Sequence, residues 1–220
     1  MWLAEPAIIL AGGPSIRKHP DLARLQGVGR IIAINRALEL PLEPDIWLWM
    51  DQPFYTWAME SPPNECMRRR AREFPGLRVT RVKRKTEEAD DGIYRLRWKG
   101  GRGIGPSFAE GVYIGNNSGY WALNIAYAAG ANPIILFGYD CQPSRNGKQR
   151  WWHDGYAPRK PGGGGVYNRM KQDFEDMAPK FTEAGATILN CSPGTALQCF
   201  PVIETIDELF ERLEEMGHVV

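Results

Sequence analysis

The sequence predicts an α/β fold in which a mostly parallel sheet is covered by helices on both faces. Short apolar runs without polar alternation recur along the chain, which is typical of strands buried on both sides. Segments with helical spacing of apolar residues separate these runs. The chain has 220 residues, of which 43% are hydrophobic, and no repeat or linker divides it, so we expect one domain over 1–220.

The first half of the chain predicts strands at Ala7–Ala11, Arg30–Ile34, Asp45–Met50 and Leu77–Val82. A helix is expected over about Ser15–Leu25, because Pro14 suits a first helical turn and the Ser15 side chain can cap its amides. A second helix is expected over Glu65–Phe74. The basic, glycine-rich stretch that ends at Gly105 indicates a hairpin or a long loop.

The second half opens with a predicted helix over Ser118–Ala129, whose small residues allow close packing on a sheet. The remaining predicted elements are a strand at Pro133–Phe137, a helix at Tyr167–Ala184, a strand at Ala186–Leu189 and an amphipathic helix at Ile206–Met216. No periodicity is found between Tyr139 and Val166, where a run of four glycines occurs at 162–165. We interpret about 141–166 as a lid.

The sequence indicates neither a secreted or membrane protein nor one held together by disulfides or zinc. The N-terminus lacks a basic region and no run of about 18 apolar residues exists, so we expect neither a signal peptide nor a membrane partner. The four cysteines have no C-x-x-C spacing, which favours reduced thiols in a cytoplasmic protein over a disulfide framework or a zinc site.

Charge is concentrated in one segment. The net charge of the chain is +1, but residues 67–102 carry +8 and the remainder carries −7. This favours a polyanion or an acidic or phosphorylated substrate, although a solvated surface of mixed charge would have the same composition. The candidate polyanion-binding residues are Arg81, Lys83, Arg84, Lys85, Arg95, Arg97, Lys99 and Arg102.

A glycine turn follows the first predicted strand, at Gly12-Gly13-Pro14-Ser15. Glycines let a ligand approach the backbone closely, and the N–H groups of such a turn can bind an anion, typically phosphate. The alternative is that the two glycines serve packing alone.

Polar residues and glycines also follow the other strands, and ligands of parallel α/β sheets bind beyond the carboxyl ends of the strands. The candidates are Asn35, Asp51, Asn117, Ser118, Gly119, Gly138, Asp140, Asn190, Ser192, Gly194 and Thr195. Each has a local alternative as a turn or capping residue, but together they favour one site.

The ordered blocks Gly12-Gly13-Pro14-Ser15, Asn35, Asn117-Ser118-Gly119, residues 134–140 and Asn190-Cys191-Ser192-Pro193-Gly194 resemble one superfamily. They look like the bacterial sialyltransferases that use CMP-sialic acid, which are Rossmann-like enzymes with a mobile lid. Residues 44–51 also look like the related archaeal 6-hydroxymethylpterin diphosphokinases. The chain is most similar to a group of phage proteins that share these blocks. The resemblance covers most of the chain, except the basic insert at about 83–105.

The resemblance implies a nucleotide-activated donor. It implies that the glycine turn, Asn35, Ser118 and Gly119 surround the nucleotide and the donor sugar, that Ser192–Thr195 contacts the nucleotide, and that Asp51 lies near the donor. The sialyltransferase turn has an asparagine where this chain has Gly12, and its phosphate-binding tyrosines have no clear match, Tyr156 being a loose analogue. These departures argue against CMP-sialic acid itself.

The lid supplies a histidine general base in that family, and His153 is the only histidine in this lid. An imidazole suits removal of a proton from an acceptor hydroxyl near neutral pH. Trp151 and Trp152 can stack on a base or sugar, or instead anchor the lid. Asp51 and Asp140 are carboxylates that Mg²⁺ would accept, but glycosyl transfer of this kind does not require a metal.

We therefore expect a nucleotide-dependent transferase, most simply a glycosyltransferase that moves a sugar from a nucleotide sugar to a hydroxyl acceptor. The phage resemblance and the basic segment make a hydroxylated base in DNA one candidate acceptor. The alternatives are a Mg²⁺-dependent diphosphotransferase acting on a small hydroxymethyl compound, and a non-catalytic nucleotide- or DNA-binding accessory protein.

Overall fold

A computed structural model describes residues 2–60, 65–82, 87–88, 91–105, 107–144, 147, 150–153 and 165–219. The strands are β1 (Ala7–Leu10), β2 (Arg30–Ile34), β3 (Ile46–Leu48), β4 (Leu77–Val82), β5 (Glu87–Glu88), β6 (Ile93–Lys99), β7 (Val112–Tyr113), β8 (Ile134–Phe137) and β9 (Ile188–Cys191). The α-helices are α1 (Gln52–Glu60), α2 (Glu65–Glu73), α3 (Ser118–Ala129), α4 (Gly165–Glu183) and α5 (Ile206–Glu215). Three short 3₁₀ helices, η1 (Pro14–Lys18), η2 (Leu22–Leu25) and η3 (Asn35–Glu39), complete the described elements.

The described strands form one sheet in the order β5-β6-β4-β3-β2-β1-β8-β9, and β7 pairs with the end of β6. All of these pairings are parallel except that of β5 with β6. The prediction of a mostly parallel, Rossmann-like α/β fold is therefore confirmed. Successive strands lead from β1 outward to β6, and the chain then returns through α3 to place β8 on the other side of β1.

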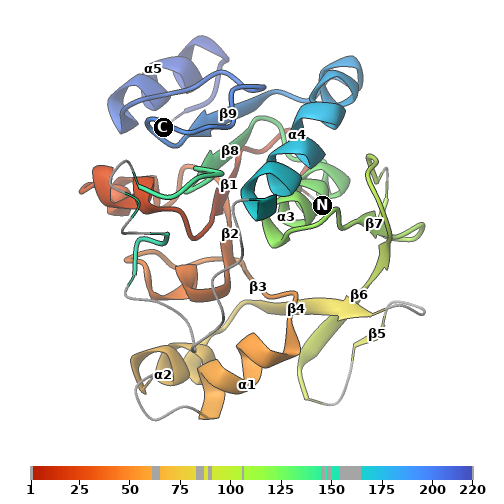
Figure 1. Cartoon of the computed structure of the whole chain (residues 1–220). Coiled ribbons are helices and arrows are strands. Elements are labelled where there is room, and N and C mark those ends of the chain that lie inside the picture. Colours follow the sequence, from red (N-terminus) through yellow and green to blue (C-terminus); the bar gives the residue numbers. More distant parts are fainter. Residues whose placement is uncertain are drawn as a thin grey trace.

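Both faces of the sheet are buried, as the unbroken apolar strands predict. Along β1, Ala7 and Ile9 face a cluster that includes α3 and α4, while Ile8 and Leu10 face a second cluster that includes α5. A third cluster packs α1 and α2 against Trp47 of β3. Figure 1 shows this division, with α3 and α4 on one side of the sheet and α5 and the red N-terminal segment on the other.

One sequence-based expectation is corrected and a second is extended. The helix expected over Ser15–Leu25 is broken into η1 and η2, and Gly13, with no side-chain cap, precedes η1. Ser15 does not cap this helix because its hydroxyl bonds to Asp140. Of the two alternatives for the basic stretch, a hairpin or a long loop, the antiparallel pair of β5 with β6 agrees with the hairpin, and β6 in addition extends the parallel sheet beside β4.

The four cysteines are free thiols, as their spacing predicts. Among the described residues, no helix is both long enough and apolar enough to cross a membrane.

Candidate active site at the switch point of the sheet

The chain reverses its direction of travel across the sheet between β1 and β8, and ligands of open α/β sheets bind at such a point. A cavity of about 480 Å³ opens there. Nine of the sequence-predicted residues line it: Gly12, Gly13, Asn35, Asn117, Ser118, Gly119, Gly138, Asp140 and Trp151. Sequence-distant strand ends and the start of α3 thus meet in one cavity.

Asp140 ties the turn after β8 to the glycine turn after β1. Its carboxylate accepts hydrogen bonds from the Ser15 amide at 3.1 Å and from the Ser15 hydroxyl at 2.7 Å. The Gly13 amide donates to the Gly138 carbonyl at 2.9 Å. Since the amides of Gly13 and Ser15 have acceptors within the protein, an anion at this turn would meet chiefly Gly12 and the opposite wall.

Gly13 is required by this arrangement. A Cβ built at residue 13 would lie 1.8 Å from the Asp140 Oδ2 and 2.4 Å from the Gly138 carbonyl oxygen. No side chain fits there without displacing the carboxylate or the backbone. The second glycine of the turn therefore serves close approach between two protein segments, which combines the packing and the site-forming interpretations.

Burial shapes the chemistry of Asp140, whose exposure is 7%. Desolvation raises the pKa of this carboxyl group, and the two hydrogen bonds from Ser15 oppose that shift. Because both carboxylate oxygens already bond to Ser15, Asp140 acts in this structure as a positioning group for the two turns.

The N-terminus of α3 forms a second wall of the cavity. The Asn117 side chain caps it by accepting a hydrogen bond from the Tyr120 amide at 2.7 Å. The Tyr139 hydroxyl donates to the Gly119 carbonyl at 3.0 Å, and a Cβ at Gly119 would lie 2.8 Å from the Tyr139 ring. The partial positive charge of this twelve-residue helix is therefore presented to the cavity.

A fully buried carboxylate on α4, Asp173, holds the loop before α3. It accepts hydrogen bonds from the Asn116 amide at 2.6 Å, the Asn116 side chain at 2.9 Å and the Arg102 Nε at 2.9 Å. The Asn117 side chain donates a longer bond of 3.4 Å. Arg102 thus stabilises the scaffold of the cavity, a role that its position in the basic segment does not predict.

Asn35 lies at the end of β2 with a backbone φ of +53°. Asparagine adopts this left-handed conformation more readily than most residues, which explains its occurrence at this strand end. The Asn35 carbonyl accepts a hydrogen bond from the Trp47 indole at 3.0 Å.

Of the segment 141–166 that the sequence predicts as a lid, the described residues Cys141, Gln142, Arg150, Trp151 and Val166 line the cavity. His153 is buried at 8% exposure and stacks parallel to Trp151 with ring centroids 5.8 Å apart, while Trp152 meets it edge to face. His153 and Trp152 are not among the lining residues. The Trp152 amide donates to the Gly12 carbonyl at 3.1 Å, and its carbonyl accepts from the Arg17 side chain, so Trp152 anchors this segment to the glycine turn.

The segment after β9 supports the cavity without lining it. The Ser192 hydroxyl accepts a hydrogen bond from the Tyr139 amide at 2.8 Å, and the Thr195 hydroxyl donates to the Tyr139 carbonyl at 2.7 Å. Asn190 donates to the Leu197 carbonyl at 3.1 Å, and the Gly194 carbonyl accepts from the Gln142 side chain at 2.6 Å. These bonds fix the backbone on which Asp140 stands.

Three further candidates do not line the cavity. Pro14 begins η1 and Ser15 is buried at 1% exposure. Asp51 follows β3, where its carbonyl accepts the first amides of α1 and its carboxylate lies 3.6 Å from the Arg81 guanidinium. Among the described residues no group of three His, Cys, Asp or Glu side chains could hold a metal ion.

Carboxylates accompany most of the described basic candidates. Arg81 lies near Asp51, Arg95 forms two bonds to Asp91, Lys99 lies 3.5 Å from Glu110, and Arg102 bonds to Asp173 and Asp176. Arg97 is exposed. Lys83, Arg84, Lys85 and Tyr156 lie outside the described residues.

Sequence reasoning missed several lining residues: Ala11, Ile34, Tyr139, Cys141, Gln142, Arg150, Val166, Tyr167, Met170 and Phe174. For Arg150, its position beside Trp151 in the sequence was the available signal. The α4 residues Val166, Tyr167, Met170 and Phe174 could not be recognised from the sequence, because a helix has the same spacing of apolar residues whether they contact the core or line a cavity.

Comparisons of the chain with models of known protein families, with curated proteins and with solved structures find no match. The fold and the site consequently define the class: a Rossmann-like α/β protein with a cavity at its switch point.

Proposed function

We propose that this protein is a nucleotide-dependent transferase whose donor binds in the switch-point cavity. The observation that supports this best is the convergence on one cavity of the α3 N-terminus, the glycine turn and Arg150. A helix N-terminus and a guanidinium both favour a phosphate group. The cavity volume, about 480 Å³, is in the range of small-molecule and cofactor sites.

The cavity also offers surfaces for the uncharged parts of a nucleotide sugar. Trp151 and Tyr167 are aromatic lining residues on which a base or a sugar ring can pack. Asn35, Asn117 and Ser118 supply polar groups for hydroxyls. We propose Arg150 and the α3 N-terminus as the groups that neutralise the leaving nucleotide phosphate.

Glycosyl transfer to a hydroxyl acceptor is the reaction we favour. In this proposal His153 takes the acceptor proton, for which it would have to reach the cavity beside Trp151. Asp140 positions the glycine turn. A hydroxylated base in DNA has the required hydroxyl and agrees with the excess of basic residues in 67–102.

The test is a thermal-shift screen with CMP, UDP, GDP, ADP, ATP and the corresponding nucleotide sugars, with and without Mg²⁺. A ligand at about 100 times its Kd stabilises by about 2.7 kcal/mol, which raises the Tm of a chain of this size by roughly 5–10 °C. Arg150→Gln should abolish most of this shift. Arg97→Gln is the matched control, because Arg97 is exposed and does not line the cavity.

A Mg²⁺-independent shift with one nucleotide sugar, lost in Arg150→Gln, supports glycosyl transfer and identifies the donor. A shift only with ATP and Mg²⁺ replaces glycosyl transfer with diphosphoryl transfer. Absence of a shift with every ligand contradicts the proposal and favours an accessory protein.

The role of His153 is tested separately once a donor is known. His153→Gln should leave the donor-induced shift intact and reduce transfer by roughly 100-fold or more, the usual contribution of a general base. Equal loss of donor binding and transfer would instead mean that His153 only supports Trp151.

A further inference from the structure

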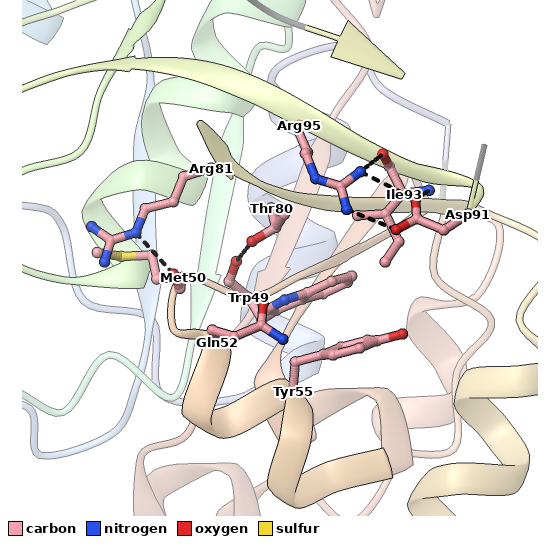
Figure 2. Close-up of a pocket in the computed structure, with 9 residues that line it drawn as sticks. All are labelled: Trp49, Met50, Gln52, Tyr55, Thr80, Arg81, Asp91, Ile93 and Arg95. Atoms are coloured by element: carbon pink, nitrogen blue, oxygen red, sulfur yellow. Dashed lines mark hydrogen bonds and ion pairs between the residues drawn. The ribbon is translucent and has the colours of Figure 1, made fainter. Parts of the chain in front are cut away.

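A second cavity, of about 340 Å³, lies between the residues that follow β3, the start of α1, and the strands β4 and β6. It shares no lining residue with the switch-point cavity. Figure 2 shows Trp49, Gln52 and Tyr55 on one side of it and Thr80 and Arg95 on the other. The nine residues that line it are Trp49, Met50, Gln52, Tyr55, Thr80, Arg81, Asp91, Ile93 and Arg95.

The two cavities border on adjacent strands. Ile34 of β2 and Leu48 of β3 are partners in the sheet register. The residue after each lines one cavity, Asn35 the switch-point cavity and Trp49 the second cavity. The two cavities are thus bordered by neighbouring strands, which lie about 4.8 Å apart. Trp47 connects them, since its indole bonds to the Asn35 carbonyl and its ring lies 4.6 Å from that of Trp49.

One wall of the second cavity is aromatic. The Trp49 and Tyr55 rings stack with centroids 4.8 Å apart and planes inclined by 16°. Trp49 is almost fully buried, and its indole N–H has no hydrogen-bond acceptor in the described structure. A buried donor without a partner costs stability, which a ligand oxygen that accepted this N–H would recover.

The opposite wall carries the guanidinium group of Arg95, which shares a face of the sheet with its register partner Thr80. Arg81 follows Thr80 in β4, so its side chain lies on the other face, near Asp51 and over the Trp98 ring. The Arg95 side chain is 28% exposed, so solvent and ligands can reach it. Arg81 is oriented by a hydrogen bond of 2.8 Å from its Nε to the Met50 carbonyl. Arg95 pairs with Asp91, whose side chain is 48% exposed, and an exposed pair of this kind contributes little to stability. Asp91 is the one acid among the described lining residues, and Asp51 lies beside Arg81, so each of these two arginines has a carboxylate partner.

We propose that this second cavity binds one nucleotide unit of the acceptor, with its phosphate at Arg95 and its ring system against Tyr55 of the Trp49–Tyr55 wall. The volume of about 340 Å³ suits a nucleotide rather than a longer segment. Guanidinium groups recognise phosphate through paired N–H donors, and aromatic side chains pack on ring faces. Calling the ligand an acceptor rests on the proposed transferase function, whereas the binding itself does not.

The test is calorimetric titration of the wild-type protein with thymidine 5′-monophosphate, thymidine, inorganic phosphate and a single-stranded oligothymidylate. We expect binding of the monophosphate and at least about tenfold weaker binding of thymidine and of phosphate alone. Arg95→Gln removes a charge-assisted contact and should weaken monophosphate binding at least about tenfold. Arg97→Gln is the control on the same strand, and Arg150→Gln is the control in the other cavity; neither should change it.

The oligothymidylate separates a free nucleotide from a nucleotide within DNA. If it binds more tightly than the monophosphate and remains sensitive to Arg95→Gln, the acceptor unit belongs to a polynucleotide; if it does not bind, the unit is free. Loss of binding in Arg97→Gln as great as in Arg95→Gln would indicate a general basic face and overturn the proposal. So would monophosphate binding that is insensitive to Arg95→Gln. Failure of the transferase proposal is distinct, because it appears as absent donor binding in the Arg150-dependent screen.

Discussion

Substitution of Gly13 by alanine tests the central feature of the cavity, the contact between the two turns. The added methyl group would lie 1.8 Å from the Asp140 Oδ2 and 2.4 Å from the Gly138 carbonyl oxygen. Neither contact can be relieved by rotating a long, flexible side chain. The Asp140 carboxylate must therefore move away from Ser15, or the turn must shift from β8.

The structure sets the magnitude of the effect. Asp140 accepts two hydrogen bonds from Ser15, and a hydrogen bond to a charged group contributes about 1.5–3 kcal/mol. Overpacking of a tight site typically costs a further 1–3 kcal/mol. Gly13→Ala should therefore destabilise the protein by at least about 3 kcal/mol, which corresponds to a decrease in Tm of roughly 6–12 °C.

Urea denaturation followed by circular dichroism measures the change in the free energy of unfolding. Gly165→Ala is the matched control, because a Cβ at that position, the start of α4, meets no atom within 4 Å. Introducing Gly13→Ala into an Asp140→Ala background should cost less than in the wild type, since the 1.8 Å contact is gone, while the contact with Gly138 remains. A cost below 1 kcal/mol in the wild type, or equal costs in both backgrounds, would refute the reasoning.

Three other predictions concern single side chains. Burial lowers the pKa of His19, whose ring bonds to the Cys191 carbonyl, so as the pH falls the unfolded protein binds a proton at His19 before the folded protein does. The stability of the wild type relative to His19→Gln should therefore fall as the pH decreases below about 6.5. Urea titrations of both proteins at several pH values measure this difference. Burial raises the pKa of Asp140, so as the pH falls the folded protein binds a proton at Asp140 before the unfolded protein does. The wild type should therefore lose stability relative to Asp140→Asn as the pH rises above the ordinary carboxyl range. If the difference in unfolding free energy between the two proteins is the same from pH 4 to 8, this prediction is contradicted. Asn117→Ala and Thr205→Ala each remove a helix cap and should each cost about 1 kcal/mol of unfolding free energy, but only Asn117→Ala, at the cavity, should also weaken donor binding in the thermal-shift screen.

Local sequence was sufficient for most of the fold. The strand at Arg30–Ile34 and the helix at Ser118–Ala129 have the bounds that their apolar patterns predict. The reason is that a strand buried on both faces and a helix with a capping asparagine and small residues are each specified by neighbouring residues. The same local reasoning failed at Ser15–Leu25, because the hydroxyl that could cap a helix bonds instead to Asp140, 125 residues away in the sequence.

The candidate site divides in the same way. The rule that ligands bind at strand ends singled out Gly12, Asn35, Ser118 and Asp140, and all four line one cavity because parallel strands end at one edge of the sheet. The order of the strands across that edge is a tertiary property. It decides that Asp51, after β3, lies away from the switch-point cavity, and that Ser192 supports the turn after β8 from behind.

The sequence by itself determined the fold class, most of the strands and helices, and the edge of the sheet at which polar residues gather. Only the tertiary structure decided which of these residues line a cavity, that Arg150 and Tyr167 join them, and that a second cavity forms around Trp49 and Arg95. Secondary structure depends on residues a few positions apart, whereas the direction of a side chain depends on the strand order and on contacts that span more than a hundred residues of sequence.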